Sequence, residues 1–441
     1  MVQRMRKMKD SGIEWIGEIP EGWEITKIKY GVTKVGSGKT PSGGAEVYTD
    51  CGVLFLRSQN IYDCSLVLDN PTYISYETDL TMKSTRILPN DILLNITGAS
   101  IGRCCVVPET LGPANVNQHV CIIRTNPEFF LPKFMQYFWV SHLGRYAISL
   151  FQTGGNREGL SFDAIRNTPI PYISIPEQSK ITTYLDSECS RIDVMLSKTR
   201  SSIEEYKKLK QAVITQAVTK GVRGEREMKD SGVEWIGKIA SNYFIYKLKH
   251  LLREPLKYGA NESGIPYSPA LPRYIRITDI TLDGKLKSSG KLSLTEESAK
   301  DYLLEDGDIL LARSGATVGK SFIYYRCYGH AAYAGYLIKA SFHEHILPKF
   351  VYYFTCSSLY EIWKNSIFIQ STIQNIGADR YANLPLPVPN SLQEQQEIAD
   401  YLDAKCAEID KLIAKKEQLV KELESYKKSL IYEVVTGKRE V

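Results

Sequence analysis

A long heptad pattern of apolar residues occurs twice along this chain. In residues 177–221, and again in residues 394–437, steps of four and three residues fall on mostly apolar positions. The second copy is displaced by 217 residues, and the polar interruption at Lys210 returns as Lys427. Apolar residues at this spacing form one seam along a helix, so the pattern predicts two long helices of similar sequence.

The two predicted helices have matching seams, so we expect them to pair as an antiparallel coiled coil. At 1.5 Å per residue each helix is roughly 65 Å long. The seam residues are Leu185, Ile192, Leu196, Ile203 and Val213 in the first helix, and Leu402, Ile409, Ile413, Val420 and Leu430 in the second. The alternative is two unrelated amphipathic helices, each packed on its own domain.

Both helices carry the same start and stop signals. Ser174 followed by Glu177, and Ser391 followed by Glu394, predict two capping boxes, in which the hydroxyl and the carboxylate bind the free amides of the first turn. A glycine after the last turn can adopt the left-handed conformation that ends a helix. These glycines are Gly221 and Gly437.

The regions that precede the helices also repeat. Residues 8–17 recur as residues 228–237 with one conservative change, which excludes chance. Residues 54–61 correspond to residues 273–280, and both segments read as a buried strand that leads to a polar loop. Arg57 and Arg276 hold the same place in these two copies.

Three further repeats complete each half. They predict a strand, glycine turn and strand, then an aromatic helix that opens at Leu-Pro-Lys-Phe, then a stiff proline hinge. The paired segments are residues 90–103 and 307–320, 131–134 and 347–350, and 167–171 and 383–387.

Each half is therefore predicted to be one mixed α/β domain followed by one long helix, which makes the fold class α+β. The predicted boundaries are residues 1–176 for the first domain, 177–221 for its helix, 222–390 for the second domain and 391–441 for its helix. Segments between the repeats hardly align, as expected for a two-headed reader with two different targets. Drift confined to surface loops is the alternative.

Composition narrows the class of protein. A chain of 441 residues with 43% hydrophobic and 24% charged residues suits two or three globular domains. The first residues lack the apolar core of a signal peptide and no 18-residue apolar run follows, so we expect a cytoplasmic protein and no membrane insertion. The nine cysteines have no metal-ligand spacing, so we expect no metal site.

No arrangement of residues predicts catalysis. The segment from Gly315 to Ser321 resembles a phosphate-binding loop but is one residue short, and its repeat copy lacks the lysine. We expect a tight hairpin whose basic residue, Arg103 or Lys320, faces a phosphate or a groove; a solvated turn charge is the alternative. The chain is therefore expected to perform no covalent chemistry.

A net charge of +5 is compatible with nucleic acid but does not demand it, so DNA binding would depend on specific contacts or on partner subunits. Arginine suits guanine edges, and asparagine or glutamine suits adenine. The candidate contacts in the first half are Lys39, Thr40, Arg57, Gln59, Asn60, Arg103, Asn117, Gln118, Asn156 and Arg157. Those in the second half are Lys257, Tyr258, Arg276, Thr278, Arg313, Lys320, Ser371, Thr372 and Gln374.

Taken together, these motifs resemble the specificity subunits of Type I restriction-modification enzymes. The resemblance covers nearly the whole chain. The motifs that carry it are the Asp-Ser-Gly and Glu-Trp-Ile-Gly sequences at the start of each half, the Gly-Asp-Ile-Leu hairpin, Asn117-Gln118, the proline segments and the Ala-Val-Thr-Lys-Gly helix end. It implies two target recognition domains, each reading half of a split site in double-stranded DNA. It also implies helices that form a spacer and dock two modification (methyltransferase) subunits.

The resemblance further implies that restriction subunits join the complex. S-adenosylmethionine, ATP and Mg are then expected on the partner subunits, with no cofactor bound by this chain. The second half has Gly259-Ala260-Asn261 where the first has a glycine-rich segment, so equivalence near residues 36–40 stays open. A rival hypothesis is a coiled-coil adaptor that binds proteins rather than DNA. The target sequence, its gap length and the methylated base cannot be predicted.

Overall fold

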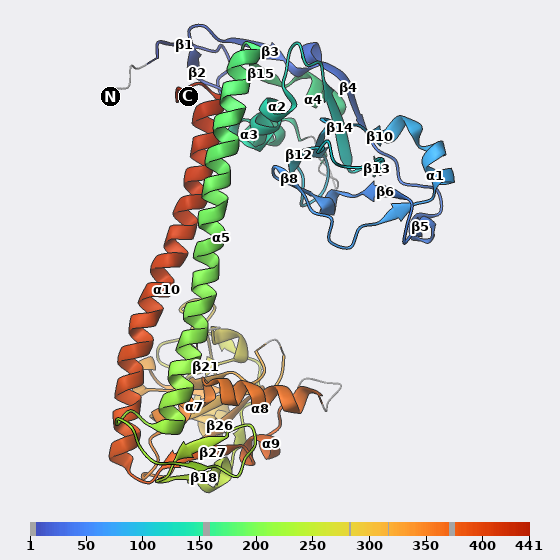
Figure 1. Ribbon diagram of the computed structural model, residues 1–441. Coiled ribbons are helices and arrows are strands. Elements are labelled where there is room, and N and C mark those ends of the chain that lie inside the picture. The colour runs from blue at the N-terminus through green and yellow to red at the C-terminus, as the bar shows by residue number, and fades with distance from the viewer. Residues whose placement is uncertain (1–5, 153–158, 282–283, 316, 370–374) are drawn as a thin grey trace. The chain divides into compact units, whose positions relative to one another are not determined.

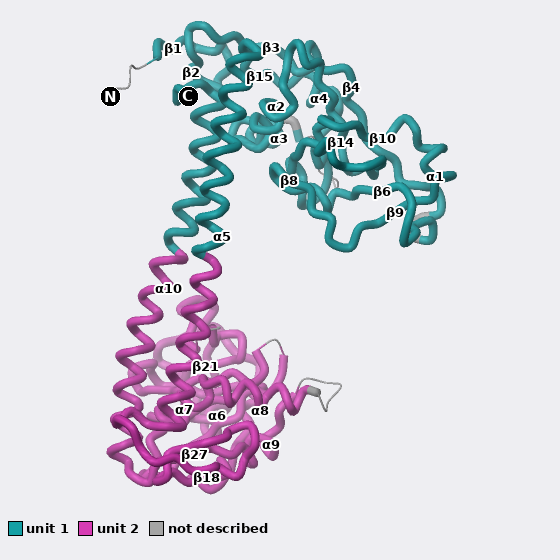
Figure 2. Tube along the Cα trace, viewed as in Figure 1, with its two compact units in different colours: residues 1–199, 418–441 teal, residues 200–417 magenta. Residues whose placement is uncertain are grey.

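The computed structural model describes residues 6–152, 159–281, 284–315, 317–369 and 375–441. The chain forms two compact units (Figures 1 and 2). Unit 1 contains residues 1–199 and 418–441, and unit 2 contains residues 200–417. We call the α/β part of unit 1, from β1 to β15, the first head, and that of unit 2, from β16 to β27, the second head.

The first head is built around two sheets. One has the order β12-β11-β14-β4 and the other β10-β13-β6-β9-β5, with β13 and β6 parallel. The strands are β1 (Met8–Asp10), β2 (Glu18–Pro20), β3 (Glu24–Lys27), β4 (Val32–Ser37), β5 (Tyr48–Thr49), β6 (Val53–Leu56), β7 (Ile61–Tyr62), β8 (Ser65–Leu66), β9 (Tyr73–Ile74), β10 (Arg86–Ile87), β11 (Ile92–Asn95), β12 (Cys104–Val106), β13 (Ala114–Val116), β14 (Val120–Thr125) and β15 (Pro169–Tyr172). The helices are α1 (Tyr76–Thr81), α2 (Pro132–Val140), α3 (His142–Phe151), α4 (Phe162–Asn167) and the long α5 (Ile175–Lys220).

The second head repeats this plan. Its sheets have the orders β24-β23-β26-β19 and β20-β22-β21-β25, again with one parallel pair, β21 and β25. The strands are β16 (Met228–Asp230), β17 (Lys238–Ala240), β18 (Tyr243–Lys247), β19 (Lys257–Tyr258), β20 (Ile265–Pro266), β21 (Arg273–Ile275), β22 (Leu292–Ser293), β23 (Ile309–Ala312), β24 (Ser321–Ile323), β25 (Ala331–Tyr333), β26 (Leu337–Ala340) and β27 (Pro385–Pro389). The helices are α6 (Glu296–Ala299), α7 (Pro348–Thr355), α8 (Ser358–Ile369), α9 (Ala378–Ala382) and the long α10 (Leu392–Val435).

The central strand of each head is buried on both faces, which explains its continuous apolar sequence. On β11, Ile92 and Leu94 pack in the core that contains Phe134 of α2, whereas Leu93 packs in the core between the two sheets with Val116. Side chains alternate along a strand, so a strand covered on both sides needs apolar residues at every position. The second head repeats this arrangement on β23.

The long helices bury the predicted seam. In unit 1 the first part of α5 packs against the last part of α10, and in unit 2 the last part of α5 packs against the first part of α10, so the helices are antiparallel (Figure 2). Leu185, Ile192, Leu196, Ile203, Leu402, Ile409 and Leu430 are buried, and Val213, Ile413 and Val420 are half-buried. The predicted fold class, with two mixed α/β domains each followed by a long pairing helix, is confirmed.

The polar interruptions of the seam have partners that the sequence analysis did not identify. The Lys427 ammonium binds the Asp193 carboxylate at 2.6 Å in unit 1. The Lys210 ammonium binds the Asp410 carboxylate at 2.7 Å in unit 2. These two ion pairs are equivalent under the 217-residue repeat. In each unit the seam lysine of one helix binds the corresponding aspartate of the other helix.

The first predicted capping box is correct for its serine and wrong for its glutamate. The Ser174 hydroxyl accepts a hydrogen bond from the Glu177 amide at 3.4 Å, as a cap should. The Glu177 carboxylate, however, accepts from the Arg6 guanidinium at 2.6 Å and from the Trp23 indole at 3.0 Å. A charged donor outcompetes a backbone amide for a carboxylate, so this glutamate ties the helix start to the N-terminal strands.

At the second helix start the prediction is wrong in both parts, because among the described residues the Ser391 hydroxyl makes no hydrogen bond to the Glu394 amide. The Glu394 carboxylate accepts from Arg226 at 2.5 Å, from Asn242 at 2.9 Å and from Tyr243 at 3.1 Å. The helix stops were predicted correctly, because Gly221 and Gly437 have φ of +74° and +70°.

The predicted proline hinges are strands instead. β15 pairs with β3, and β27 pairs with β18, both antiparallel. The carbonyl of Thr168 accepts a hydrogen bond from the Ile28 amide. The backbone N–H and C=O groups of the even-numbered residues of β15 therefore point toward β3, and those of the two prolines point away from it. Alternating prolines therefore remove no ladder hydrogen bond at an edge.

Candidate nucleic-acid interface

The two heads share a glycine hairpin beside the central strand. In the first head it joins β11 to β12, and in the second it joins β23 to β24. Gly98 and Gly102 have φ of +73° and +84°, and Gly315 and Gly319 have φ of +78° and +81°. β24 follows this turn directly, with no helix whose N-terminus could hold a phosphate, so the hairpin is not a nucleotide-binding loop.

Strand register establishes residue equivalence at this end of each head. Cys121 of β14 lies opposite Ser37 of β4, and Ile338 of β26 lies opposite Tyr258 of β19. Ile96 donates its amide to the His119 carbonyl, and Arg313 donates its amide to the Tyr336 carbonyl, each at 3.0 Å. Equivalent positions therefore carry different side chains on the same backbone.

A conserved glycine shows how tight this shared backbone is. An added Cβ at Gly38 would lie 1.8 Å from the Val116 carbonyl oxygen, and one at Gly259 would lie 2.4 Å from that of Tyr333. Neither position can carry a side chain without moving the neighbouring strand. Gly38 and Gly259 are therefore equivalent, which answers the question that the sequence left open near residues 36–40.

We call this region of each head the hairpin end. In the first head it comprises Ser37, Ile96, Thr97, Gln118 and His119. In the second head it comprises Tyr258, Arg313, Ser314, Gly335 and Tyr336.

The first hairpin end is a chain of hydrogen-bonded polar side chains. Thr97 Oγ1 and His119 Nδ1 lie 2.6 Å apart, and Gln118 Nε2 lies 3.3 Å from His119 Nε2. The Thr40 hydroxyl donates to the Gln118 side-chain carbonyl. Lys39, Thr40 and Gln118 are exposed. Asn117 is buried, and its side chain accepts from the His119 amide, so it shapes the turn from within.

The second hairpin end is cationic and aromatic. The Arg313 guanidinium lies over the Tyr258 ring, 4.8 Å from its centroid. The Tyr258 hydroxyl accepts from the Ala378 amide at 3.0 Å, which fixes the ring. Lys257 is exposed and hydrogen-bonds to Glu254. This bond, against the opposing effect of burial and with help from Lys339, lowers the pKa of Glu254 to about 2.

Arg57 and Arg276 occupy the same structural position, as predicted from the repeat, and both stabilise their own loops. Each residue precedes a short 3₁₀ helix, η3 (Ser58–Asn60) or η6 (Ile277–Asp279). The Arg276 guanidinium binds Asp279, and the Arg57 guanidinium binds Thr72. Asn60 is buried with both ends of its amide bonded to backbone. The exposed residues of these loops are Gln59 and Thr278.

The remaining predicted contacts divide into two groups. Arg103 is half-buried with its guanidinium 4.5 Å from the centroid of the Tyr62 ring, and Lys320 is half-buried at the same position of the second hairpin. Five predicted residues lie outside the described residues: Asn156, Arg157, Ser371, Thr372 and Gln374.

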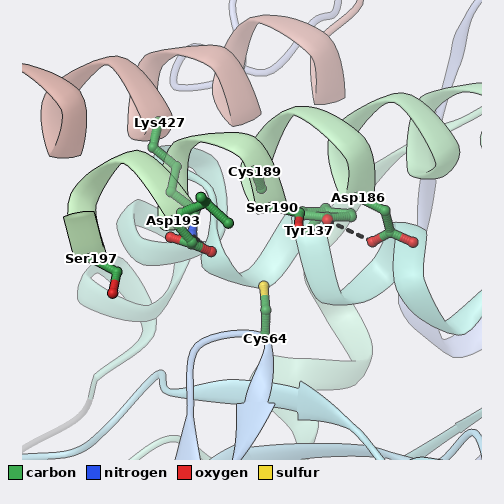
Figure 3. Close-up of a pocket in the computed structure, with 9 residues that line it drawn as sticks. Cys64, Tyr137, Asp186, Cys189, Ser190, Asp193, Ser197 and Lys427 are labelled. Atoms are coloured by element: carbon green, nitrogen blue, oxygen red, sulfur yellow. Dashed lines mark hydrogen bonds and ion pairs between the residues drawn. The ribbon is translucent and has the colours of Figure 1, made fainter.

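An open pocket of about 430 Å³ in unit 1 offers no catalytic site (Figure 3). Cys64 points into it from the β7–β8 loop, and Lys427 reaches across to Asp193. Desolvation, with nearby carboxylates, raises the pKa of Cys64 to about 12, and burial raises that of Cys189 to about 11. Neither thiol is a nucleophile at neutral pH. Within the described residues, no cluster of histidine, cysteine and carboxylate side chains could hold a metal.

Two heads with one frame and different side chains at the hairpin end define a two-headed binding protein. The model of the family "Type I restriction modification DNA specificity domain" matches residues 20–205 and 273–422. The chain belongs to this family.

Specificity subunits of Type I restriction enzymes are among its relatives. The chain is 27% identical over 168 residues to the EcoBI subunit of Escherichia coli, covering 38% of this chain and 35% of that protein. It is 23% identical over 321 residues to the StySPI subunit of Salmonella potsdam, covering 71% and 66%. It is 22% identical over 440 residues to the MjaVIII subunit of Methanocaldococcus jannaschii, covering 95% and 93%. The matched region thus covers about a third of the length of the EcoBI subunit and about two thirds of the length of the StySPI subunit.

Solved structures share the fold. A chain from a structure concerned with complex assembly and conformational transition of the type I R-M system aligns with a TM-score of 0.73 at 16% identity, covering 95% of this chain and 98% of that one. The HsdS subunit from Thermoanaerobacter tengcongensis aligns with a TM-score of 0.52 at 16% identity, covering 96% and 98%. Over the residues that the structure describes, no helix has the length and apolar character needed to cross a bilayer.

Proposed function

We propose that this chain is the non-catalytic DNA-recognition subunit of a Type I restriction-modification complex. Each head reads one half of a split target in double-stranded DNA. The observation that carries this proposal is the pair of hairpin ends, in which one backbone frame presents Thr97, Gln118 and His119 in one head and Tyr258 and Arg313 in the other. Two different readers on one frame suit two different half-sites.

The proposed DNA contacts are the predicted residues that remain accessible. They are Lys39, Thr40, Gln59, Arg103 and Gln118 in the first head, and Lys257, Tyr258, Thr278, Arg313 and Lys320 in the second. We do not retain Asn60 and Asn117, because both are buried and hydrogen-bonded within their own loops. We do not retain Arg57 and Arg276 either, because their guanidinium groups bind Thr72 and Asp279 within their own heads. Lysines at such a surface suit phosphates, whereas amides and arginine suit base edges.

We propose residues 1–176 and 222–390 as the recognition domains, and residues 177–221 and 391–441 as a spacer made of the paired helices. A helical spacer gives two short half-sites around an unread gap, on the scale of one DNA turn of roughly 34 Å. It also provides the surface on which partner subunits assemble.

The partners proposed are two modification (methyltransferase) subunits, together with restriction subunits. The repeat supports two equivalent docking positions, since one helix written twice presents the same outer face twice. Met195 of α5 and Leu412 of α10 are equivalent under the 217-residue repeat, and both are exposed apolar side chains on these outer faces. S-adenosylmethionine, ATP and Mg would bind those partners in the cytoplasm, because this chain contributes recognition only.

The test is to map methylated bases across the genome of a cell that expresses this chain with its cognate modification subunit, against a control cell that lacks the chain. We expect one new split motif, with two defined half-sites and a gap of fixed length. A stable complex that adds no new motif would contradict DNA recognition and favour the coiled-coil adaptor.

A further inference from the structure

The hairpin ends differ at three positions that the β-sheet register makes equivalent. Register and amide hydrogen bonds equate Ser37 with Tyr258, Ile96 with Arg313, and His119 with Tyr336. At each position the side chain differs between the heads, although the backbone around it does not.

The backbone beside these positions is sterically fixed in both heads. Gly38 and Gly259 immediately follow Ser37 and Tyr258, and both are held by strands that leave no room for a side chain. The backbone is therefore the same in both heads at Gly38 and Gly259, although the side chain of the preceding residue differs. A fixed frame with exchanged side chains is what a change of ligand specificity requires.

Arg313 has the properties of a base reader rather than of a structural arginine. Its guanidinium stacks on Tyr258 and makes no hydrogen bond to the described residues. Arg57 and Arg273 also have a buried Nε without a partner, but each donates a hydrogen bond from its Nη2 within its own head. By contrast, the Arg276 guanidinium is bound by both oxygens of the Asp279 carboxylate.

A second unsatisfied group lies beside Arg313. Asn375 forms an isolated β-bridge with Ser314, the next residue after Arg313. Its side-chain carbonyl oxygen is buried and also lacks a hydrogen-bond partner among the described residues. The bridge therefore places the backbone of Asn375 beside the segment that carries Arg313.

We propose that Arg313, oriented by Tyr258, reads a guanine in the second half-site. This inference rests on the proposed DNA recognition. A planar guanidinium can donate two parallel hydrogen bonds to guanine O6 and N7, and stacking on a fixed ring holds it in the required plane. In the first head Ile96 takes the place of Arg313, so that half-site is read by other groups, led by Gln118.

The experiment compares methylation maps of complexes that contain the full chain, either wild type or altered at one residue. Arg313→Ala should make one guanine position of the second half-site degenerate, with discrimination reduced roughly 10- to 100-fold, and should leave the first half-site intact. Gln118→Ala is the reciprocal control and should relax only the first half-site.

Arg313→Lys separates base reading from phosphate binding. Lysine keeps the charge but loses the paired donors, so a base reader loses its guanine preference, whereas a phosphate contact keeps it. This variant also carries the test if Arg313→Ala fails to assemble. An unchanged second half-site in both Arg313 variants, or an equal loss at both half-sites, would overturn this inference. If the wild-type complex itself added no split motif, the proposed function would fail instead.

Discussion

At the scale of single residues, one glutamate at each helix start joins distant parts of a head. Glu394 has a side chain that is 2% exposed and accepts hydrogen bonds from Arg226, Asn242 and Tyr243. Burial alone would raise the pKa of this carboxyl, but these three donors together outweigh burial, and the pKa is lowered. The charged form is therefore bound more tightly in the folded state than in the unfolded chain.

This shift predicts a dependence of stability on pH. A carboxyl with a lowered folded-state pKa stabilises the protein above its unfolded pKa of about 4.3, and this contribution is lost as the pH falls below that value. Glu394→Gln should lower the free energy of unfolding at pH 7 by about 1–3 kcal/mol and flatten the acid limb of the stability profile. Urea unfolding at several pH values measures both.

Glu408→Gln is the matched control, because Glu408 lies on the exposed side of α10 and binds only its neighbour Lys405 among the described residues. It should change little at any pH. Acid limbs of equal slope in wild type and Glu394→Gln would show that the carboxylate does not join the helix to the head.

At the scale of elements, the paired helices specify their own alignment. Apolar seams alone tolerate a shift by one heptad, whereas a polar residue at a seam position favours the register that gives it a partner. Lys427 meets Asp193 and Lys210 meets Asp410, once in each unit. Because these pairs are partly exposed, their effect on stability is small, and their main consequence is register.

Charge reversal tests this role. Lys427→Asp places two carboxylates together and should lower the free energy of unfolding by about 1 kcal/mol. Adding Asp193→Lys restores an opposite-charge pair and should recover most of that loss, as measured by urea unfolding. The equivalent changes at Lys210 and Asp410 provide the internal control. If the double variant were no more stable than the single one, the pairs would not stabilise the observed register.

Long periodic patterns were predicted best from the sequence. The heptad spacing of α5 and α10 extends over many turns, and the glycine stops need only one positive φ, so both were predicted correctly. β15 and β27 were missed, because alternating prolines usually argue against a strand and only the edge position allows them. The Glu177 and Glu394 contacts were missed because their partners lie more than 150 residues away.

The candidate site was predicted only in part for a similar reason. Polar residues such as Gln118 and Lys257 could be chosen as candidates because they lie in predicted loops. The equivalence of Ser37 with Tyr258 cannot be recognised from the amino-acid sequence. It follows from strand register, which depends on pairing between distant segments. The unsatisfied Nε of Arg313 likewise depends on burial, which a local pattern does not report.

At the scale of the whole molecule, each unit is assembled from segments that are far apart in the sequence. The core of the first head includes Leu430 and Val434 of α10, and the core of the second head includes Ala217 and Val218 of α5. Gly437 packs directly on Pro20 and Trp23, where a side chain would clash. The first core is therefore completed only after α10 has been made, and such non-local contacts favour slow folding.

The central claim is that the two heads recognise their half-sites independently. The most direct test replaces residues 1–176 with the first head of another family member, keeps both helices, and maps methylated bases in a cell with the same modification subunit. We predict that one half-site changes, while the other half-site and the gap length stay as in wild type. A change in both half-sites, or in neither, despite normal assembly of the complex, would contradict the account.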